Sequence, residues 1–104
     1  MKMTVHAYLT LKFKSEGLSP KTEFLFYPGR KWRADFFFPE INTITEVDGG
    51  VYSQGRHVRG IGYINDCEKL NHATAMGIQV YRVATIEQAN WVVEVIKSQM
   101  KAKP

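Results

Sequence analysis

Two short apolar runs, residues 32–38 and 43–47, most constrain what this chain can fold into. Both are rich in aromatic or β-branched residues, and Pro39 closes the first of them. Because the connection between them is short, the two runs are expected to pair as antiparallel strands. Carboxylates nevertheless interrupt this hairpin, with Asp35 in the first run and Glu46 and Asp48 at the end of the second. The sequence thus places three acids where a sheet normally builds its core.

The segments before this hairpin predict a helix and one more strand. Thr4 is suited to cap a helix that Gly17 ends, and its apolar residues follow helical spacing (Val5, Tyr8, Leu9 and Phe13). A strand is the alternative there, because residues 5–13 also alternate in places. Residues 23–27 predict a strand that the Pro28-Gly29 turn closes.

The segments after the hairpin predict a crossover. Residues 51–66 resemble a surface loop, and a helix is expected from Asn65 or Asp66 to Gly77, with Asp66 as its cap. Its expected buried residues are Ile64, Cys67, Leu70 and Thr74. A strand follows at residues 78–83, and Thr85 with Gln88 forms a capping box for a last helix with one apolar stripe (Ala89, Val92, Val93, Ile96 and Met100). The predicted fold is a single α/β domain over residues 1–104, ordered α-β-β-β-α-β-α, with a mixed four-stranded sheet and flanking helices.

Composition limits the classes of function. The chain has 104 residues, of which 44% are hydrophobic and 23% charged, which is typical of a globular domain. The net charge of +4 favours an anionic partner such as nucleic acid. Cys67 is the one cysteine, which excludes a disulfide framework and a thiolate-rich metal site. No apolar run is long enough for a membrane helix, so a cytoplasmic protein without a membrane partner is expected.

The three carboxylates have two explanations. Strand alternation puts Asp35 on one face with Phe37, and Glu46 on one face with Ile44 and Asp48. Carboxylates brought together repel one another unless a cation lies between them, and oxygen ligands suit Mg²⁺ or Mn²⁺. The alternative is that the acids lie at strand ends in solvent, paired with nearby basic residues.

A longer pattern favours the metal. A strand with an Asp, a turn, a strand ending in Glu-x-Asp and a following helix resemble the PD-(D/E)XK nuclease superfamily. The run from residue 30 to 83 (RKWRADFFFPE, ITEVDGGVYSQGRHVRG and NDCEKLNHATAMGIQVYRV) is similar to small phage and bacterial nucleases of the restriction-endonuclease-like fold, near the VRR-NUC and very-short-patch-repair groups. The resemblance covers about half of the chain. It implies a restriction-endonuclease-like fold and a Mg²⁺-dependent or Mn²⁺-dependent DNA endonuclease, with junctions or flaps as expected substrates.

The resemblance also assigns roles to residues. Asp35 and Glu46 would be metal ligands, and Val47 would add its backbone carbonyl. Asp48 occupies the position of the Lys in the motif. Either Asp48 would join the metal shell, or a basic residue elsewhere would replace that Lys. Lys69 is the candidate for this replacement. Glu23 matches the extra upstream acid of related resolvases, and its alternative is a charge that protects a strand edge.

The remaining expectations concern partners and the aromatic residues. Cationic or polar residues near the acids are expected to contact DNA phosphates (Arg30, Lys31, Arg33, Gln54, Arg56, His57 and Arg59). The aromatic residues are expected in the core rather than stacked on bases (Trp32, Phe36, Phe37, Phe38, Tyr81 and Trp91). A homodimer is expected, because cutting two strands needs two active sites. The alternatives are a non-catalytic nucleic-acid-binding relative and an interaction module that docks through its last helix.

Overall fold

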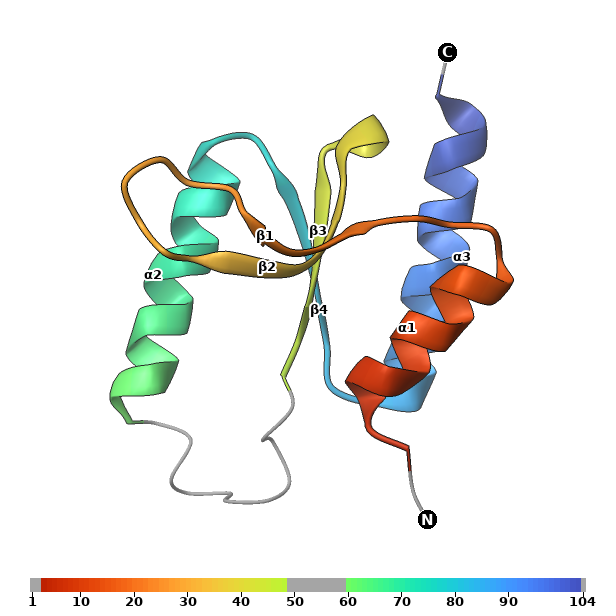
Figure 1. The fold of residues 1–104 in the computed structure, drawn as a ribbon, viewed down its shortest axis with the longest axis horizontal. Helices are drawn as coiled ribbons and strands as arrows, with labels where there is room; N and C mark the ends of the chain where they lie inside the picture. The colour runs from red at the N-terminus through yellow and green to blue at the C-terminus, as the bar shows by residue number, and fades with distance from the viewer. Residues whose placement is uncertain (1–2, 49–59, 104) are drawn as a thin grey trace.

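The chain forms one mixed sheet with helices on both of its sides (Figure 1). The computed structural model describes residues 3–48 and 60–103. In chain order the elements are α1 (Val5–Ser15), β1 (Lys21–Leu25), β2 (Arg33–Phe38), the 3-10 turn η1 (Pro39–Ile41), β3 (Thr43–Val47), α2 (Ile61–Ala75), β4 (Gln79–Val83) and α3 (Ile86–Ala102). Apart from the short turn η1, this order confirms the α/β fold predicted from the sequence.

The strand order in the sheet is β1-β2-β3-β4, the same as in the chain. The first three strands pair antiparallel, with Thr22 opposite Phe36 and Phe37 opposite Ile44. Because the chain passes through α2 before it returns to the sheet, β4 lies parallel to β3. The predicted mixed, four-stranded sheet is therefore confirmed.

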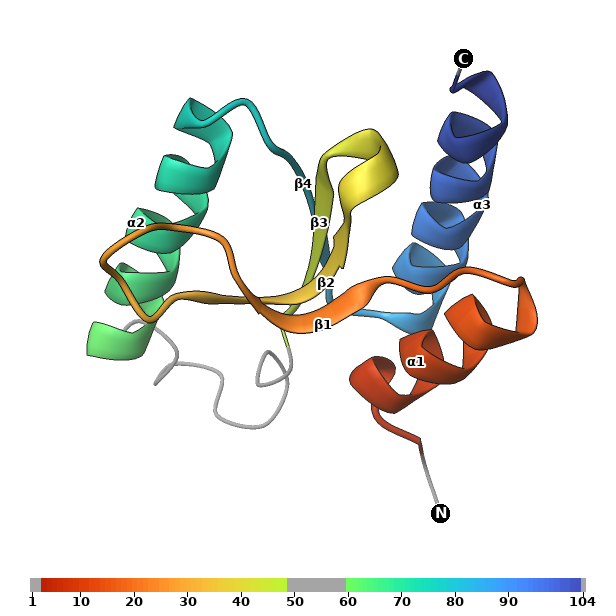
Figure 2. The same ribbon diagram turned by 45° about the horizontal axis from the view of Figure 1, so that its top comes forward.

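Hydrophobic clusters fill both faces of the sheet. On one face, α1 and α3 cover Phe36 and Phe38, and Leu9 of α1 and Ile96 of α3 are fully buried against them. On the other face, α2 contributes Ala73 to a cluster with Phe37 and Ile44. Figure 2 shows the resulting arrangement, with α2 on one side of the strands and α1 and α3 on the other. Over residues 36–38 of β2, successive side chains thus belong to different clusters, as strand alternation requires.

The predicted helix signals function as expected at three positions. The Thr4 side chain accepts a hydrogen bond from the Ala7 N–H at the start of α1. Thr85 and Gln88 form a reciprocal capping box at the start of α3. Gly77 follows α2 with a φ of +84°, a left-handed conformation that glycine adopts without strain.

Several boundaries predicted from the sequence are wrong. β1 begins at Lys21 and ends at Leu25, two residues earlier than residues 23–27. α2 begins at Ile61, so residues 61–66 belong to the helix and not to a loop. Asp66 consequently lies inside α2 and caps nothing. A helix can begin without a capping side chain, and Gly60 occupies the N-cap position of α2.

Three residues expected in the core are exposed. Ile64 and Trp91 have exposed fractions of 58% and 59%, and Thr74 is exposed as well. α2 packs on the sheet mainly through Leu70 and Ala73, which lie in its C-terminal half. Its N-terminal turns therefore leave their apolar residues uncovered by the described part of the chain.

Candidate metal-binding site

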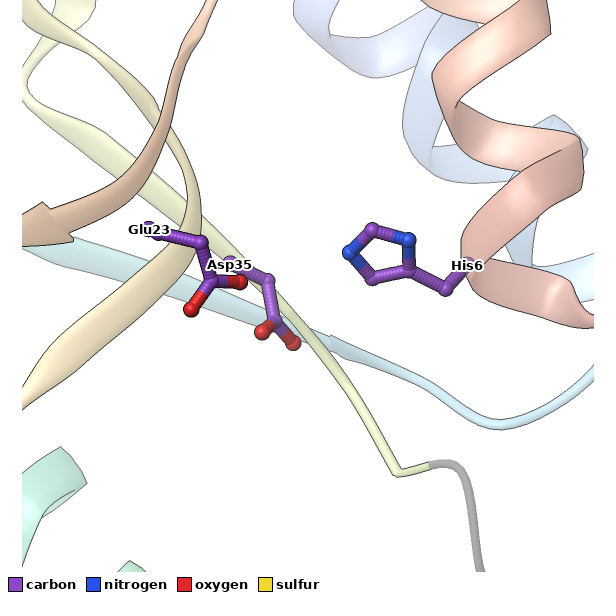
Figure 3. A group of neighbouring side chains, drawn as sticks. All are labelled: His6, Glu23 and Asp35. Carbon is purple, nitrogen blue, oxygen red and sulfur yellow. The ribbon is translucent and has the colours of Figure 1, made fainter.

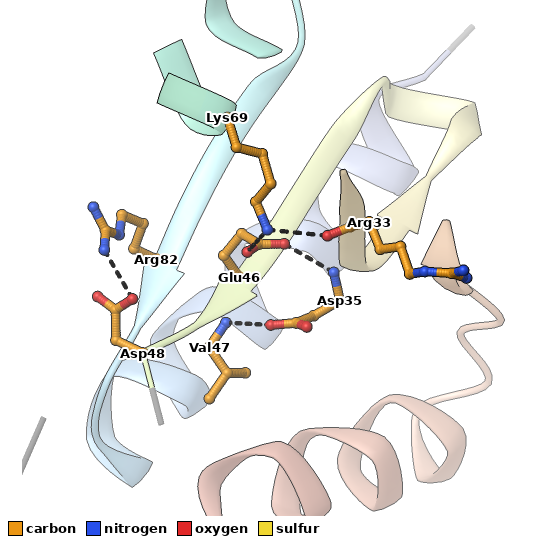
Figure 4. Close-up of polar contacts among 7 residues, drawn as sticks. All are labelled: Arg33, Asp35, Glu46, Val47, Asp48, Lys69 and Arg82. Atoms are coloured by element: carbon orange, nitrogen blue, oxygen red, sulfur yellow. Dashed lines mark hydrogen bonds and ion pairs between the residues drawn. The ribbon is translucent and has the colours of Figure 1, made fainter. Parts of the chain in front are cut away.

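The candidate site lies where β2 and β3 stop forming a regular ladder. Their backbone pairing ends at Phe36 opposite Thr45, so Asp35 and Glu46 come immediately beyond the last pair. Here side chains take the place of backbone partners (Figure 4). The Asp35 N–H donates to Glu46 Oε2 at 2.8 Å, and the Val47 N–H donates to Asp35 Oδ2 at 2.8 Å. Each of the two carboxylates is thus fixed by a backbone N–H of the facing strand.

Lys69 of α2 reaches Glu46 from the helix that covers one face of the sheet. Its Nζ donates to Glu46 Oε1 at 2.7 Å and to the Arg33 carbonyl at 3.0 Å. The side chains of Lys69 and Glu46 are only 13% and 9% exposed. An ion pair so largely withdrawn from water is costly to break, because the remaining charge loses its partner and its solvent together. Lys69 is therefore fixed beside the Glu46 carboxylate.

The surroundings of Glu46 raise the pKa of its carboxyl group. Burial raises the pKa of Glu46 above the ordinary glutamate value, and the negative charge of Asp35 acts in the same direction. The hydrogen bonds from Lys69 and from the Asp35 N–H oppose this effect without cancelling it. A buried carboxylate beside a second acid is a group that a divalent cation would stabilise in its charged form.

A second set of side chains converges on Asp35 from the face that α1 covers. His6 of α1, Glu23 of β1 and Asp35 each offer a ligand atom, and these atoms lie within 4.8 Å of one another (Figure 3). Glu23 lies between Thr22 and Phe24, whose partners Phe36 and Ala34 flank Asp35. Two carboxylates and an imidazole at this separation form a donor set that fits Mn²⁺ or Mg²⁺.

Glu23 holds an unusual backbone conformation. Its φ is +49°, in the left-handed region that residues with a side chain rarely adopt. Such a conformation costs about 1–2 kcal/mol and is concentrated at functional sites in proteins generally. The strain coincides with the point where Glu23 faces Asp35.

Val47 has the backbone orientation that its expected role needs. The Asp48 N–H donates to the Val83 carbonyl of β4, and the Gln79 N–H of β4 donates to the Asn42 carbonyl. The even-numbered residues along β3 therefore direct their backbone groups toward β4. Val47 falls between these residues, and its N–H bonds to Asp35 on the opposite side. Because the N–H and C=O of one strand residue point the same way, the Val47 carbonyl also faces the Asp35 side.

Asp48 lies apart from the two carboxylates. Arg82 of β4 donates to Asp48 Oδ1 at 2.8 Å, and the hydrogen bond and charge of Asp48 raise the pKa of Arg82. Asp48 is thus paired with Arg82, and Lys69 is the cation that contacts Glu46.

The residues expected to contact DNA divide into two groups. Arg30, Lys31 and Arg33 are exposed near the site. Arg30 is partly engaged, since its guanidinium contacts Glu68 at 3.1 Å and lies 3.9 Å from the centre of the Trp32 ring. Gln54, Arg56, His57 and Arg59 lie outside the described residues.

His6 is the site residue that the sequence reading missed. It precedes Leu9 by three residues and Phe13 by seven, so it lies on the same face of α1 as two buried residues. Its ring contacts Phe36 at a centroid distance of 4.9 Å. The helical spacing was a usable signal that His6 faces the sheet, although only the packing of α1 brings it to Asp35.

Comparisons with protein-family models, with curated proteins and with solved structures find no match to this chain. Among the described residues, no helix has the length and apolar character needed to cross a membrane.

Proposed function

We propose that the protein is a Mg²⁺-dependent or Mn²⁺-dependent nuclease that hydrolyses phosphodiester bonds in DNA. The observation that carries the proposal is the meeting of Asp35, Glu46 and Lys69 at the end of the β2–β3 ladder, with Lys69 Nζ 2.7 Å from Glu46 Oε1. These are the residue types that the resembled PD-(D/E)XK nucleases use. The element order and the parallel β4 agree with the restriction-endonuclease-like fold that the resemblance implies.

The donor set decides which residues would hold the cation. Asp35 is common to both groups of side chains, with Glu46 and the Val47 carbonyl on one side and Glu23 and His6 on the other. Oxygen donors dominate, which favours Mg²⁺ or Mn²⁺ over Zn²⁺. A bound divalent cation supplies charge neutralisation for the scissile phosphate and lowers the pKa of a coordinated water.

Lys69 would supply the positive charge that the motif places two residues after the Glu. In the structure its ammonium group is held by Glu46 and the Arg33 carbonyl, so little reorganisation is needed to keep it at the reaction centre. From there it can donate a hydrogen bond to a phosphate oxygen and stabilise the negative charge that develops as water attacks phosphorus and the bond to the leaving oxygen breaks. Asp35 and Glu46 would also orient the attacking water.

Exposed basic residues near the site would hold the substrate. Lys31 precedes β2 and Arg33 is its first residue, and their charges would contact phosphates next to the scissile one. Such contacts position a nucleic acid without reading its sequence. Branched DNA, a junction or a flap, remains the substrate class that the resemblance favours.

The alternative is a nucleic-acid-binding relative without catalysis, for which the Asp48–Arg82 pair at the motif Lys position is the specific observation. Cleavage of labelled junction, flap, duplex and single-stranded DNA with Mg²⁺, Mn²⁺ or EDTA separates the two. The nuclease predicts cleavage that requires metal and disappears in Asp35→Asn. Glu40→Gln is the matched control, because Glu40 is an exposed acid in η1, at the other end of β2. Binding without cleavage under every metal would favour the alternative.

A further inference from the structure

The two edges of the sheet are protected differently. β1 forms one edge, where Lys21 and Glu23 are exposed and the left-handed Glu23 interrupts the flat strand. β4 forms the other edge, and its single charged side chain, Arg82, is paired with Asp48 of the same chain. Proteins usually protect an edge strand with charges, bulges or prolines, because an open edge pairs with other strands. Among residues 3–48 and 60–103, β1 has such protection and β4 does not.

The helices on both faces of the sheet carry exposed apolar side chains. On the α3 side, Trp91 is 59% exposed and its ring lies 6.0 Å from that of Tyr81. On the α2 side, Ile61 and Ile64 are 73% and 58% exposed. A groove of about 320 Å³ runs between α2 and β4, lined by Cys67, Leu70, Asn71, Thr74, Val80 and Arg82. Of the α2 residues that the sequence predicts as buried, Ile64 and Thr74 are thus exposed, and Thr74 lines the groove beside β4.

The backbone of β4 is suited to a partner strand. Gln79 bonds to Asn42, and Val83 accepts from Asp48, so the odd-numbered residues of β4 are the ones joined to β3. Alternation then directs the N–H and C=O groups of Val80 and Arg82 to the outer edge. Two outward residues placed symmetrically about Tyr81 can pair with the same two residues of an identical strand.

The three helices do not cover this edge. The extents of the molecule are 42 × 39 × 17 Å, and the shortest is close to the width of about four strands at roughly 4.8 Å spacing. In Figure 1, viewed along that shortest axis, α2 and α3 stand on opposite sides of the overlapping strands. The helices therefore flank the sheet and leave its edge strands on the broad surfaces of a thin molecule.

We propose that β4 is a dimerisation strand, which pairs antiparallel with β4 of a second copy about a twofold axis at Tyr81. Val80 of each copy would lie opposite Arg82 of the other, and the two Tyr81 side chains would meet next to both Trp91 rings. Because Asp48 neutralises each Arg82, no unpaired charge is buried. The pairing joins two four-stranded sheets into one, and it does not depend on the proposed nuclease activity.

Sedimentation equilibrium across the micromolar concentration range tests whether this surface forms a dimer. The wild-type protein is expected to form dimers, and Trp91→Lys is expected to raise the dissociation constant about tenfold or more, as for a central aromatic contact. Leu11→Lys is the matched control, since Leu11 is 55% exposed on α1 and should leave the dissociation constant unchanged. Both substitutions are on exposed helix positions, so both variants should fold.

Disulfide formation tests the proposed register between the two β4 strands. In a Cys67→Ser background, Tyr81→Cys should cross-link two copies on oxidation, because residues facing each other in a pair without backbone hydrogen bonds are about 4.5 Å apart at Cα. Leu25→Cys, on the β1 edge, should not cross-link. A protein that stays monomeric at every concentration would overturn the proposal. So would a dimer that tolerates Trp91→Lys and cross-links through residue 25 instead of residue 81.

Discussion

Replacing Lys69 by methionine should destabilise the protein at neutral pH by an amount that the structure allows to be estimated. The substitution keeps most of the apolar stem and removes the charge that Glu46 accepts at 2.7 Å. Loss of one partner from a fully buried pair costs about 3–5 kcal/mol. Glu46 keeps its hydrogen bond from the Asp35 N–H and slight solvent exposure, so about 2 kcal/mol is expected here. For a chain of this size that lowers the melting temperature by roughly 10 °C.

The assay is urea unfolding followed by circular dichroism, with Lys97→Met as the matched control. Lys97 also forms an ion pair, with Glu16 at 2.9 Å, but its side chain is 31% exposed and its loss should matter much less. Adding Glu46→Gln to Lys69→Met should restore much of the lost stability, because the buried charge is then gone. Equal effects of the two lysine variants, or simple additivity in the double variant, would refute the reasoning about a withdrawn ion pair.

Three further outcomes follow from the site. Because the pKa of Glu46 is raised, the folded state binds this proton more tightly than the unfolded state does. The free energy of unfolding should therefore fall as pH rises from the unfolded glutamate pKa through the folded pKa. Thermal unfolding of Glu46→Gln over the same pH series should lack this part of the fall. Glu23→Gly should stabilise the fold by about 1 kcal/mol in urea unfolding, since glycine accepts the left-handed backbone, and should weaken Mn²⁺ binding in calorimetric titration. Mn²⁺ should raise the melting temperature of the wild type, and His6→Ala should reduce that increase whereas Thr10→Ala, one turn further along α1, should not.

Much of the fold could be predicted because its signals are local. The bounds of β3, the capping box at Thr85 and the glycine after α2 depend on residues close together in the chain. The antiparallel pairing of the first three strands follows from short connections, and the parallel β4 follows from the crossover through α2.

The wrong predictions of burial concern residues whose exposure depends on how the helices pack on the sheet. The helical pattern of Ile64 and Thr74 predicts burial, but α2 buries Leu70 and Ala73 instead and leaves both of these residues exposed. Trp91 was expected inside from its apolar character, yet the α3 stripe that faces the sheet passes through Val92 and Val93. Hydrophobicity alone does not say which apolar residues a small sheet can cover.

At the candidate site, too, some contacts follow from local sequence signals and others depend on tertiary packing. Asp35 and Glu46 follow from hairpin register, and Lys69 was named because the motif Lys is absent. Its contact with Glu46 depends on how α2 docks on the sheet. His6 comes from a helix 29 positions before Asp35 in the sequence, and no short-range pattern joins the two.

The most direct test of the account is the rate at which purified protein nicks supercoiled plasmid with Mg²⁺, measured for the wild type and for Asp35→Asn at equal folded concentration. Asp35 is the group shared by every donor set at the site, so its amide variant should lose nicking while it retains the circular dichroism spectrum and melting transition of a folded protein. Unchanged nicking by folded Asp35→Asn would contradict the central claim that this carboxylate holds the catalytic cation.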